Sequence, residues 1–325
     1  MKALQFVGSA DAEVNDLPSP TIKPDEVLVA TRRVGICHSD IDLLEGRYII
    51  PFSYPVIPGH EWAGEIIEAG RDVTGLAAGD RVVGECVIGS DHFGFSISGA
   101  AAEYFVARPE WLHRMPDGMT WTQGALVEPF SCGYFATLGA DNLDAADTVA
   151  VFGAGPIGLG VVAAAAARRA RVIIIEPSAR RAELARELGA ELHLDPAAGD
   201  LAEQMAAATS GRLADVVIEA SGNPAAMAAT LQVAGFGARL VNVGIDVGRS
   251  APAQLGLIQS KQLQIRGTIG SPGVWPRTLR FLERTGIDLS PLVTSTVPLQ
   301  DAAGAVARAR TDRSEIKVHL VVAAR

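Results

Sequence analysis

The chain has 325 residues, of which 48% are hydrophobic and 20% are charged. This length can bury two hydrophobic cores, and the composition, which includes 34 glycines, excludes a disordered chain. The formal net charge is −9 and no run of basic residues occurs, so we expect no nucleic acid partner.

No segment predicts a membrane span or a secretory leader. The longest apolar run, residues 161–167, is closed by Arg168 and is far shorter than the ~20 residues that a bilayer requires. The N-terminal residues lack the apolar stretch of a signal peptide. The three cysteines, Cys37, Cys86 and Cys132, are an odd number and widely spaced, which indicates reduced thiols. We therefore expect a cytoplasmic protein without membrane contact.

The first part of the chain predicts a β-rich domain with long loops. Short runs of β character, broken by Gly, Pro and Asp, occur at residues 26–30, 81–83 and 102–107.

From residue 147 the pattern changes to a short apolar strand, a glycine turn and an alanine-rich helix. This alternation is typical of βαβ units in a parallel sheet, whose strands are buried on both faces. The expected strands are residues 148–152, 172–176, 216–219, 240–243 and 263–266. After about residue 271 the alternation stops, and the rest predicts a helix, a loop and a last strand at 317–322.

The segment V-A-V-F-G-A-G-P-I-G-L-G holds a G-x-G-x-x-G turn between an expected strand and an expected helix. Gly153 allows the tight turn, Gly155 lets the backbone approach a pyrophosphate, and Gly158 lets the helix pack on the strand. The alternative is that the glycines only tighten a turn. We expect dinucleotide contacts from this loop and from later strand ends: Gly153, Gly155, Pro156, Ile157, Gly158, Glu176, Arg181, Val243 and Ile269.

Glu176 closes the next expected strand at the offset where an acidic side chain meets the ribose hydroxyls of a dinucleotide. A carboxylate there repels a 2′-phosphate, so the sequence favours NAD over NADP. Arg180 and Arg181 follow closely and, in another geometry, would bind that phosphate. The alternative for Glu176 is a solvated strand end.

Three places in the first part of the chain carry residue types that bind metals. They are Cys37, the pair His60 and Glu61, and the segment with Glu128 and Cys132. A thiolate, an imidazole and a carboxylate suit a catalytic Zn²⁺, which takes three protein ligands and keeps one position open. Each residue also has an ordinary interpretation as a packed thiol, a core histidine or a surface carboxylate.

Four segments, together with the glycine loop, occur in the order found in the zinc-containing alcohol and polyol dehydrogenases of the medium-chain dehydrogenase/reductase family. These segments are C-H-S-D at 37–40, G-H-E-W-A-G-E-I-I-E-A-G-R-D-V at 59–73, G-D-R-V-V at 79–83 and G-A-R-L-V-N-V-G at 237–244. The chain resembles that family over essentially its whole length. The resemblance implies an α/β fold with a β-rich GroES-like catalytic domain at 1–140. It also implies a Rossmann domain with a doubly wound parallel sheet at 141–271 and a return to the catalytic domain at 272–325.

The resemblance also implies a set of zinc ligands. Cys37 and His60 match the first two ligands, and Glu61 matches the glutamate that can enter or leave the zinc shell. The segment E-P-F-S-C-G is similar to E-P-L-S-V-G of the sorbitol and threonine dehydrogenase branch, which makes Glu128 the third fixed ligand. Cys132 falls at a neighbouring position that usually faces the nicotinamide.

Local physics agrees with the choice of Glu128. Pro129 suits the first position of a helix, which predicts Glu128 as the N-cap, where a carboxylate is favoured by the helix dipole. Many relatives also carry a lobe with four cysteines that binds a structural zinc. Here Cys86 stands alone in the matching region, so we expect one zinc per chain and Cys86 as ordinary packing.

The resemblance assigns a proton route with one departure. Ser39 matches the hydroxyl residue that passes the substrate proton on, although a loop hydroxyl with a local turn bond is the alternative. Asp40 is placed to hold His60. Relatives often carry a histidine three residues after the serine, and this chain has Asp42 there. An acid at that place would relay the proton through water.

The expected substrate is a secondary alcohol that NAD oxidises to a ketone. Thr296 replaces the substrate-binding arginine of sorbitol dehydrogenases and Leu43 replaces a tyrosine, which points away from sorbitol and towards another polyol, a cyclitol or an aminocyclitol. The alternatives are a simple secondary-alcohol dehydrogenase and a zinc-free alkene or quinone reductase. We expect a homodimer or homotetramer. Aromatic candidates for the pocket wall, which more often only pack, are Trp62, His92, Phe93 and Phe95.

Overall fold

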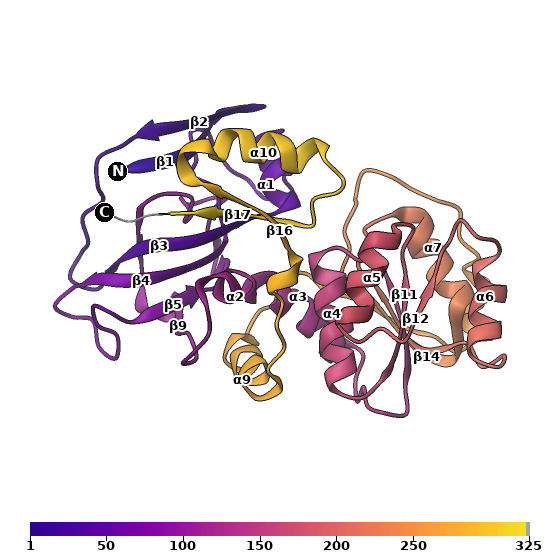
Figure 1. Ribbon diagram of the computed structural model, residues 1–325. Coiled ribbons are helices and arrows are strands. Elements are labelled where there is room, and N and C mark those ends of the chain that lie inside the picture. The colour runs from indigo at the N-terminus through magenta and orange to yellow at the C-terminus, as the bar shows by residue number, and fades with distance from the viewer. Residues whose placement is uncertain (323–325) are drawn as a thin grey trace. The chain divides into compact units, whose positions relative to one another are not determined.

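The computed structural model describes residues 1–322 (Figure 1). The chain divides into two compact units, one of Met1–Glu128 with Trp275–Arg325 and one of Pro129–Val274. Helix α3 (Val127–Gly139) carries the chain from one unit to the other. The sequence pattern shows only where βαβ alternation begins, which is why it suggests a later border, near residue 140.

The first unit is built from two separate parts of the chain. The first part contains β1 (Lys2–Gly8), β2 (Asp11–Asp16), β3 (Val27–Ile36), α1 (His38–Leu44), β4 (Glu61–Ala69), β5 (Arg81–Gly84), β6 (Val87–Ile88), β7 (Asp91–His92), β8 (Tyr104–Ala107), η1 (Pro109–Trp111), β9 (Leu112–Arg114) and α2 (Trp121–Ala125). The second part contains α9 (Trp275–Thr285), η2 (Ser290–Leu292), β16 (Val293–Pro298), η3 (Leu299–Asp301), α10 (Ala302–Thr311) and β17 (Lys317–Val321).

Strand β3 organises the sheet of this unit. The sheet runs in the order β16-β17-β3-β4-β5-β9, with β8 also paired to β3. β4, β8 and β17 all pair with β3 in antiparallel register, and Gly35 lies between Glu61 on β4 and His319 on β17. The last strand of the chain is therefore next to the strand that precedes Cys37. Figure 1 shows β17 lying beside β3.

The second unit is a parallel sheet flanked by helices (Figure 1). Its elements are β10 (Thr148–Phe152), α4 (Pro156–Ala167), β11 (Arg171–Ile175), α5 (Ala179–Glu187), β12 (Leu192–Leu194), α6 (Leu201–Ala208), β13 (Ala214–Glu219), α7 (Pro224–Val233), β14 (Ala234–Asn242), α8 (Gly256–Ser260) and β15 (Gln264–Gly267). The strand order is β12-β11-β10-β13-β14-β15, with every pair parallel. This is the doubly wound order of dinucleotide-binding sheets, which reverses between β10 and its neighbour β13.

The expected parallel sheet is confirmed, and the strand bounds differ where burial is one-sided. β10 coincides with residues 148–152, all of which are buried. β14 begins at Ala234, six residues before the expected start. Its first half was missed because it contains glycine and the exposed Phe236, and so lacks the continuous apolar run of a buried strand. β12 was not expected, since three half-buried residues form no recognisable pattern.

Within residues 1–322, no helix combines the length and the apolar character needed to cross a lipid bilayer.

The glycine turn after β10 depends on two close contacts of the backbone. Gly153 has φ +90°, which favours glycine. A Cβ atom on Gly158 would lie 1.9 Å from the carbonyl oxygen of Gly153, whereas a Cβ atom on Gly155 would meet nothing within 4 Å. Packing within the second unit therefore requires glycine at position 158, as the sequence predicted. At Gly155 the space beside the backbone is open.

Replacing Gly158 by alanine should destabilise the protein because the clash is with backbone, which cannot rotate away. Overpacking of this kind costs about 1–3 kcal/mol, and each kcal/mol lowers the thermal midpoint of a unit of this size by roughly 2–4 °C. Thermal unfolding followed by circular dichroism measures the effect. Gly155→Ala is the matched control and should change the midpoint much less. Equal midpoints for the two variants would contradict the packing argument.

Candidate functional site

Cys37, His60 and Glu61 come together at one end of the first unit's sheet. Cys37 follows β3 and is the N-cap of α1, His60 directly precedes β4, and Glu61 is the first residue of β4. The antiparallel register of β3 and β4 sets Glu61 opposite Gly35, two residues before Cys37. Each of the three residues offers one ligand atom, and these atoms lie within 4.8 Å of one another. A thiol, an imidazole and a carboxylate at this spacing form a donor set that suits Zn²⁺.

His60 is held from both sides of its ring. Its Nδ1 atom lies 3.4 Å from the Oδ1 atom of Asp40, and its Nε2 atom lies 3.4 Å from the hydroxyl oxygen of Ser39. The Oδ2 atom of Asp40 accepts a hydrogen bond of 2.9 Å from the backbone N–H of Cys37. Asp40 therefore links the two expected ligands, as anticipated from the sequence.

The surroundings of His60 favour a positive charge. Burial opposes protonation of this imidazole, but Asp40 and the thiol of Cys37 outweigh burial and raise the pKa of His60 well above its usual value. His60 is only 4% exposed, so its Nδ1 atom gains little from water, and this atom forms no well-aligned hydrogen bond within residues 1–322. Surroundings that stabilise a positive charge on this side chain would also stabilise a bound metal ion.

Glu61 is completely buried and paired with Lys317. Its Oε1 atom accepts a hydrogen bond of 2.7 Å from Nζ of Lys317, which also donates to the backbone oxygen of Ile36 at 3.2 Å. Burial lowers the pKa of Lys317, but the negative charges of Glu61, Cys37 and Glu128 outweigh burial and raise it, so Lys317 is charged. The Oε2 atom of Glu61 has no partner within residues 1–322.

Gly35 provides the space that the Glu61 side chain occupies. A Cβ atom on Gly35 would lie 2.2 Å from Oε2 of Glu61, so any other residue would displace the carboxylate. On the other side of Gly35 lies His319, whose pKa falls to about 3 because it is buried, with further lowering by Lys317 and Arg33. His319 is therefore neutral, and Lys317 supplies the positive charge beside Glu61.

Sequence reasoning missed Lys317. Lysine occurs only four times in the chain, and Lys317 opens the strand K-V-H-L-V, in which three of the other four residues are apolar. The signal in the sequence was a lysine at the start of an expected buried strand. Its partner could not be predicted, because Glu61 lies 256 residues away in the sequence.

Glu128 acts electrostatically on the buried pair of Glu61 and Lys317. It is in the first turn of α3, which begins at Val127, so the expected N-cap position is wrong. The reason is that α2 ends at Ala125, with Leu126 as its C-cap, and α3 begins at the next residue. Its carboxylate raises the pKa of Lys317, which shows that it is electrostatically close to the buried pair. The ligand role of Glu128 stays a prediction.

Asp42 and the two other cysteines have distinct surroundings. Asp42 forms an ion pair with Arg47 at 3.0 Å, and its relay role stays a prediction. Cys132 is buried within α3. Burial raises the pKa of Cys86 to about 12, and its thiol donates to the backbone oxygen of Phe93 at 3.7 Å.

The glycine loop of the second unit presents a helix N-terminus. Gly155 is the N-cap of α4, Pro156 is its first residue, and the first N–H groups of such a helix have no acceptor within it. Glu176 accepts hydrogen bonds from the backbone N–H groups of Ala154 at 2.8 Å and Ser178 at 2.9 Å. The acidic residue thus lies directly beside the turn, where an acceptor for ribose hydroxyls is required.

The remaining expected cofactor residues are spread over the second unit. Arg181 donates from Nη1 to the backbone oxygen of Ala154 at 3.4 Å, and Ile157 lies in the first turn of α4. Val243 is buried just after β14, and Ile269 is exposed after β15. Their contacts with a cofactor stay predictions.

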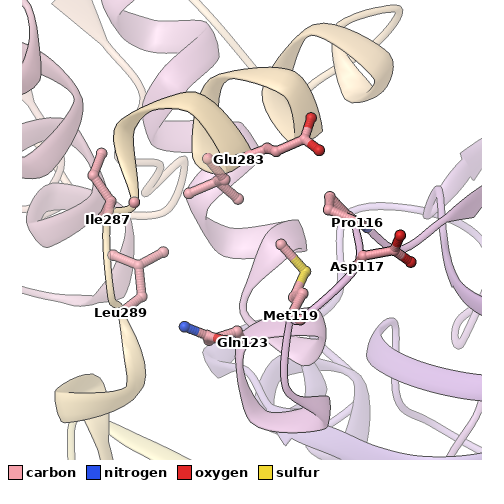
Figure 2. A pocket seen from close by; sticks show the side chains of 10 residues that line it. Pro116, Asp117, Met119, Gln123, Glu283, Ile287 and Leu289 are labelled. Atoms are coloured by element: carbon pink, nitrogen blue, oxygen red, sulfur yellow. The ribbon is translucent and has the colours of Figure 1, made fainter.

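A pocket elsewhere in the first unit is lined by none of the expected site residues. It has a volume of about 170 Å³ and lies among α9, the loop at 116–119 and Leu289 (Figure 2). Two carboxylates, Asp117 and Glu283, lie at its rim without a histidine or cysteine. This composition offers no donor set like that of Cys37 and His60.

Known proteins match the whole chain. Residues 156–284 match the family of zinc-binding dehydrogenases, and residues 23–117 match the GroES-like domain of alcohol dehydrogenases. The chain is 32% identical to sorbitol dehydrogenase of Bacillus subtilis (strain 168), over 97% of this chain and 95% of that protein. It is 29% identical to scyllo-inosose 3-dehydrogenase of Thermotoga maritima, over 96% and 90% of the two chains.

A solved structure shows the same fold. It is named as a zinc-binding dehydrogenase of Sinorhizobium meliloti 1021 bound to NADP, and it matches with a TM-score of 0.92 at 27% identity, over 98% of both chains. The expected fold class, a GroES-like domain with a Rossmann domain, is confirmed. The chain belongs to the zinc-containing medium-chain alcohol and polyol dehydrogenases, and it is an oxidoreductase that uses zinc and a nicotinamide cofactor on an alcohol substrate.

Proposed function

We propose that the protein reversibly oxidises a secondary alcohol of the polyol, cyclitol or aminocyclitol type to a ketone with NAD, using one zinc ion per chain. The observation that carries this proposal is the group formed by Cys37, His60 and Glu61, whose ligand atoms lie within 4.8 Å of one another. A zinc-free reductase would have no need for a buried carboxylate and a buried imidazole in contact range of a thiol.

Cys37, His60 and Glu128 would hold the zinc ion, and Glu61 would enter or leave its shell. When bound, the ion supplies a Lewis acid that makes a hydroxyl group easier to deprotonate. Ser39, whose hydroxyl oxygen lies 3.4 Å from Nε2 of His60, would pass the substrate proton on. Asp42, three residues further along α1, would pass this proton on through water.

Lys317 neutralises part of the negative charge that Glu61 would offer to a metal ion. Its ammonium group donates to Oε1 of Glu61, and Oε2 has no partner among the residues that the structure describes. The same carboxylate can therefore serve as the partner of Lys317 through one oxygen and turn the other towards a cation. This division supports the exchangeable role that we assign to Glu61.

NAD is favoured by the arrangement of Glu176. Both oxygens of this carboxylate accept backbone hydrogen bonds, which holds a negative charge beside the glycine turn. That charge would repel a 2′-phosphate and accept hydrogen bonds from the free ribose hydroxyls of NAD. The Sinorhizobium meliloti protein is bound to NADP. In this chain, Arg180 or Arg181 would have to turn towards the 2′-phosphate for NADP to bind.

The substrate class is supported by two observations. Sorbitol dehydrogenase and scyllo-inosose 3-dehydrogenase are both among the relatives that match nearly the whole chain. Thr296, at the place of the arginine of sorbitol dehydrogenases, is exposed on β16. A neutral side chain there favours another polyol or a cyclitol over sorbitol.

A homodimer or homotetramer is supported by the edge of the second unit's sheet. β15 is the outermost strand, and all four of its residues are exposed. Ile265 and Ile269 are among the exposed large hydrophobic side chains of this region. An unpaired edge with apolar side chains is a surface at which a second copy can pair.

The choice of Glu128 over Cys132 as the third ligand can be tested by metal analysis. Glu128→Ala should lose most of its zinc or its activity, because two fixed ligands remain where catalytic sites use three. Cys132→Ala, the matched control from the same helix, should keep its zinc. Zinc per chain is measured by mass spectrometry after dialysis. Loss of zinc in the cysteine variant alone would show that the ligand is Cys132.

Lys317→Met should destabilise the metal-free protein strongly. Removing one partner of a buried ion pair costs about 3–5 kcal/mol because the other charge stays buried and unpaired. We expect the thermal midpoint of chelator-treated protein to fall, and to fall less when zinc is restored. In the variant Lys317→Met with Glu61→Gln the loss should be partly recovered. Additive losses in the double variant would show that the two side chains do not stabilise each other.

Glu176→Gln removes the charge beside the glycine turn and keeps the size of the side chain. We expect the ratio of kcat/KM for NAD over NADP to fall by about tenfold, which corresponds to roughly 1.4 kcal/mol. Steady-state kinetics with both cofactors measures this ratio. A wild-type enzyme that prefers NADP would refute the role given to Glu176.

A further inference from the structure

Phe95 connects the metal-binding histidine to a tyrosine. Its ring centroid lies 4.7 Å from that of His60 and 4.2 Å from that of Tyr48, and it is stacked on Tyr48 with an angle of 8° between the rings. Phe95 is only 1% exposed. The Phe95 ring, stacked on Tyr48 and tilted by 38° to His60, therefore links the two side chains.

The position of Phe95 is fixed by backbone contacts. Gly94 has φ +83°, and a Cβ atom on it would lie 3.1–3.2 Å from backbone atoms of Gly59 and His60. The backbone N–H of Phe95 donates to the oxygen of His92 at 3.0 Å. The short segment after β7 is thus packed directly on the backbone that carries His60, and this packing holds the Phe95 ring between its neighbours.

Tyr48 offers a hydroxyl group that the protein does not use. The side chain is half-buried, and its O–H forms no hydrogen bond with any residue in the range 1–322. Tyr54, on the same loop, instead donates to the backbone oxygens of Leu43 and Leu44 at 2.7 and 3.1 Å. The Tyr48 oxygen is not one of the buried polar atoms that lack a partner, so it is open to water or to a ligand.

The electrostatic environment keeps this phenol protonated. Burial raises the pKa of Tyr48, the charges of Cys86, Cys37 and Asp40 raise it further, and His60 lowers it in part. The groups that act on Tyr48 are those that surround the expected metal. Its O–H is therefore available as a hydrogen-bond donor across the working pH range.

We propose that Tyr48 is a specificity-determining residue whose O–H binds a second hydroxyl of the substrate, on a carbon next to the one that is oxidised. Phe95 positions the Tyr48 ring through stacking. This inference rests on the proposed function and narrows it to alcohols with vicinal hydroxyl groups, linear or cyclic.

The test compares alcohols that differ by one neighbouring hydroxyl. The zinc-loaded protein is assayed with 2-butanol and 2,3-butanediol, and with cyclohexanol and 1,2-cyclohexanediol, using NAD. In the wild type kcat/KM should favour each diol. In Tyr48→Phe this preference should fall by about tenfold or more, mainly through a higher KM for the diol, because a site built to bind a hydroxyl loses that discrimination with its partner.

Tyr54→Phe is the matched control, since it removes a phenol O–H from the same loop that is already bonded to backbone. It should lower the thermal midpoint and change the preference for diols less than twofold. Equal preferences in wild type and Tyr48→Phe would overturn the role of Tyr48 while the proposed oxidation stands. A wild type that oxidises none of the four alcohols and no polyol would overturn the proposed function, and the inference with it.

Discussion

The buried ion pair between Glu61 and Lys317 is the interaction on which the candidate metal site of Cys37, His60 and Glu61 depends. A carboxylate without any solvent exposure is stable only when its charge is neutralised, and the ammonium group 2.7 Å away does this. Gly35 leaves the space for the carboxylate. Strand β3 pairs with β4, which carries Glu61, on one side and with β17, which carries Lys317, on the other. Without the lysine, the fully buried carboxylate of Glu61 would lose the ammonium group that neutralises its charge.

The surroundings of His60 follow from the same constraint. Asp40 holds one side of the ring and the backbone of Cys37, so the two residues cannot move independently. Phe95 packs against the ring from a third direction. A ligand fixed in this way needs little reorganisation when a metal binds, which is what a site for repeated turnover requires.

Much of the fold was predictable because each signal was local. Strand β10 could be predicted to the residue, since burial on both faces leaves a continuous apolar run. Gly153 and Gly158 were predictable because a tight turn and a close approach exclude other residues. The start of β14 was not, because its glycine-rich first half carries no periodicity. The N-cap assigned to Glu128 was wrong because the sequence cannot show that α2 runs almost directly into α3.

The candidate site divides in the same way. Cys37, His60 and Glu61 stand in short motifs, whereas Lys317 and Tyr48 acquire their meaning only from neighbours in space.

The strand order of the first unit also has a consequence for biosynthesis. β17 must insert between β16 and β3, yet it is made after the entire second unit. A ribosome releases Cys37, His60 and Glu61 long before Lys317, so for most of synthesis Glu61 lacks its counter-ion. The ion pair between Glu61 and Lys317 therefore forms late in synthesis, and the second unit can fold before the first unit has received its last strand.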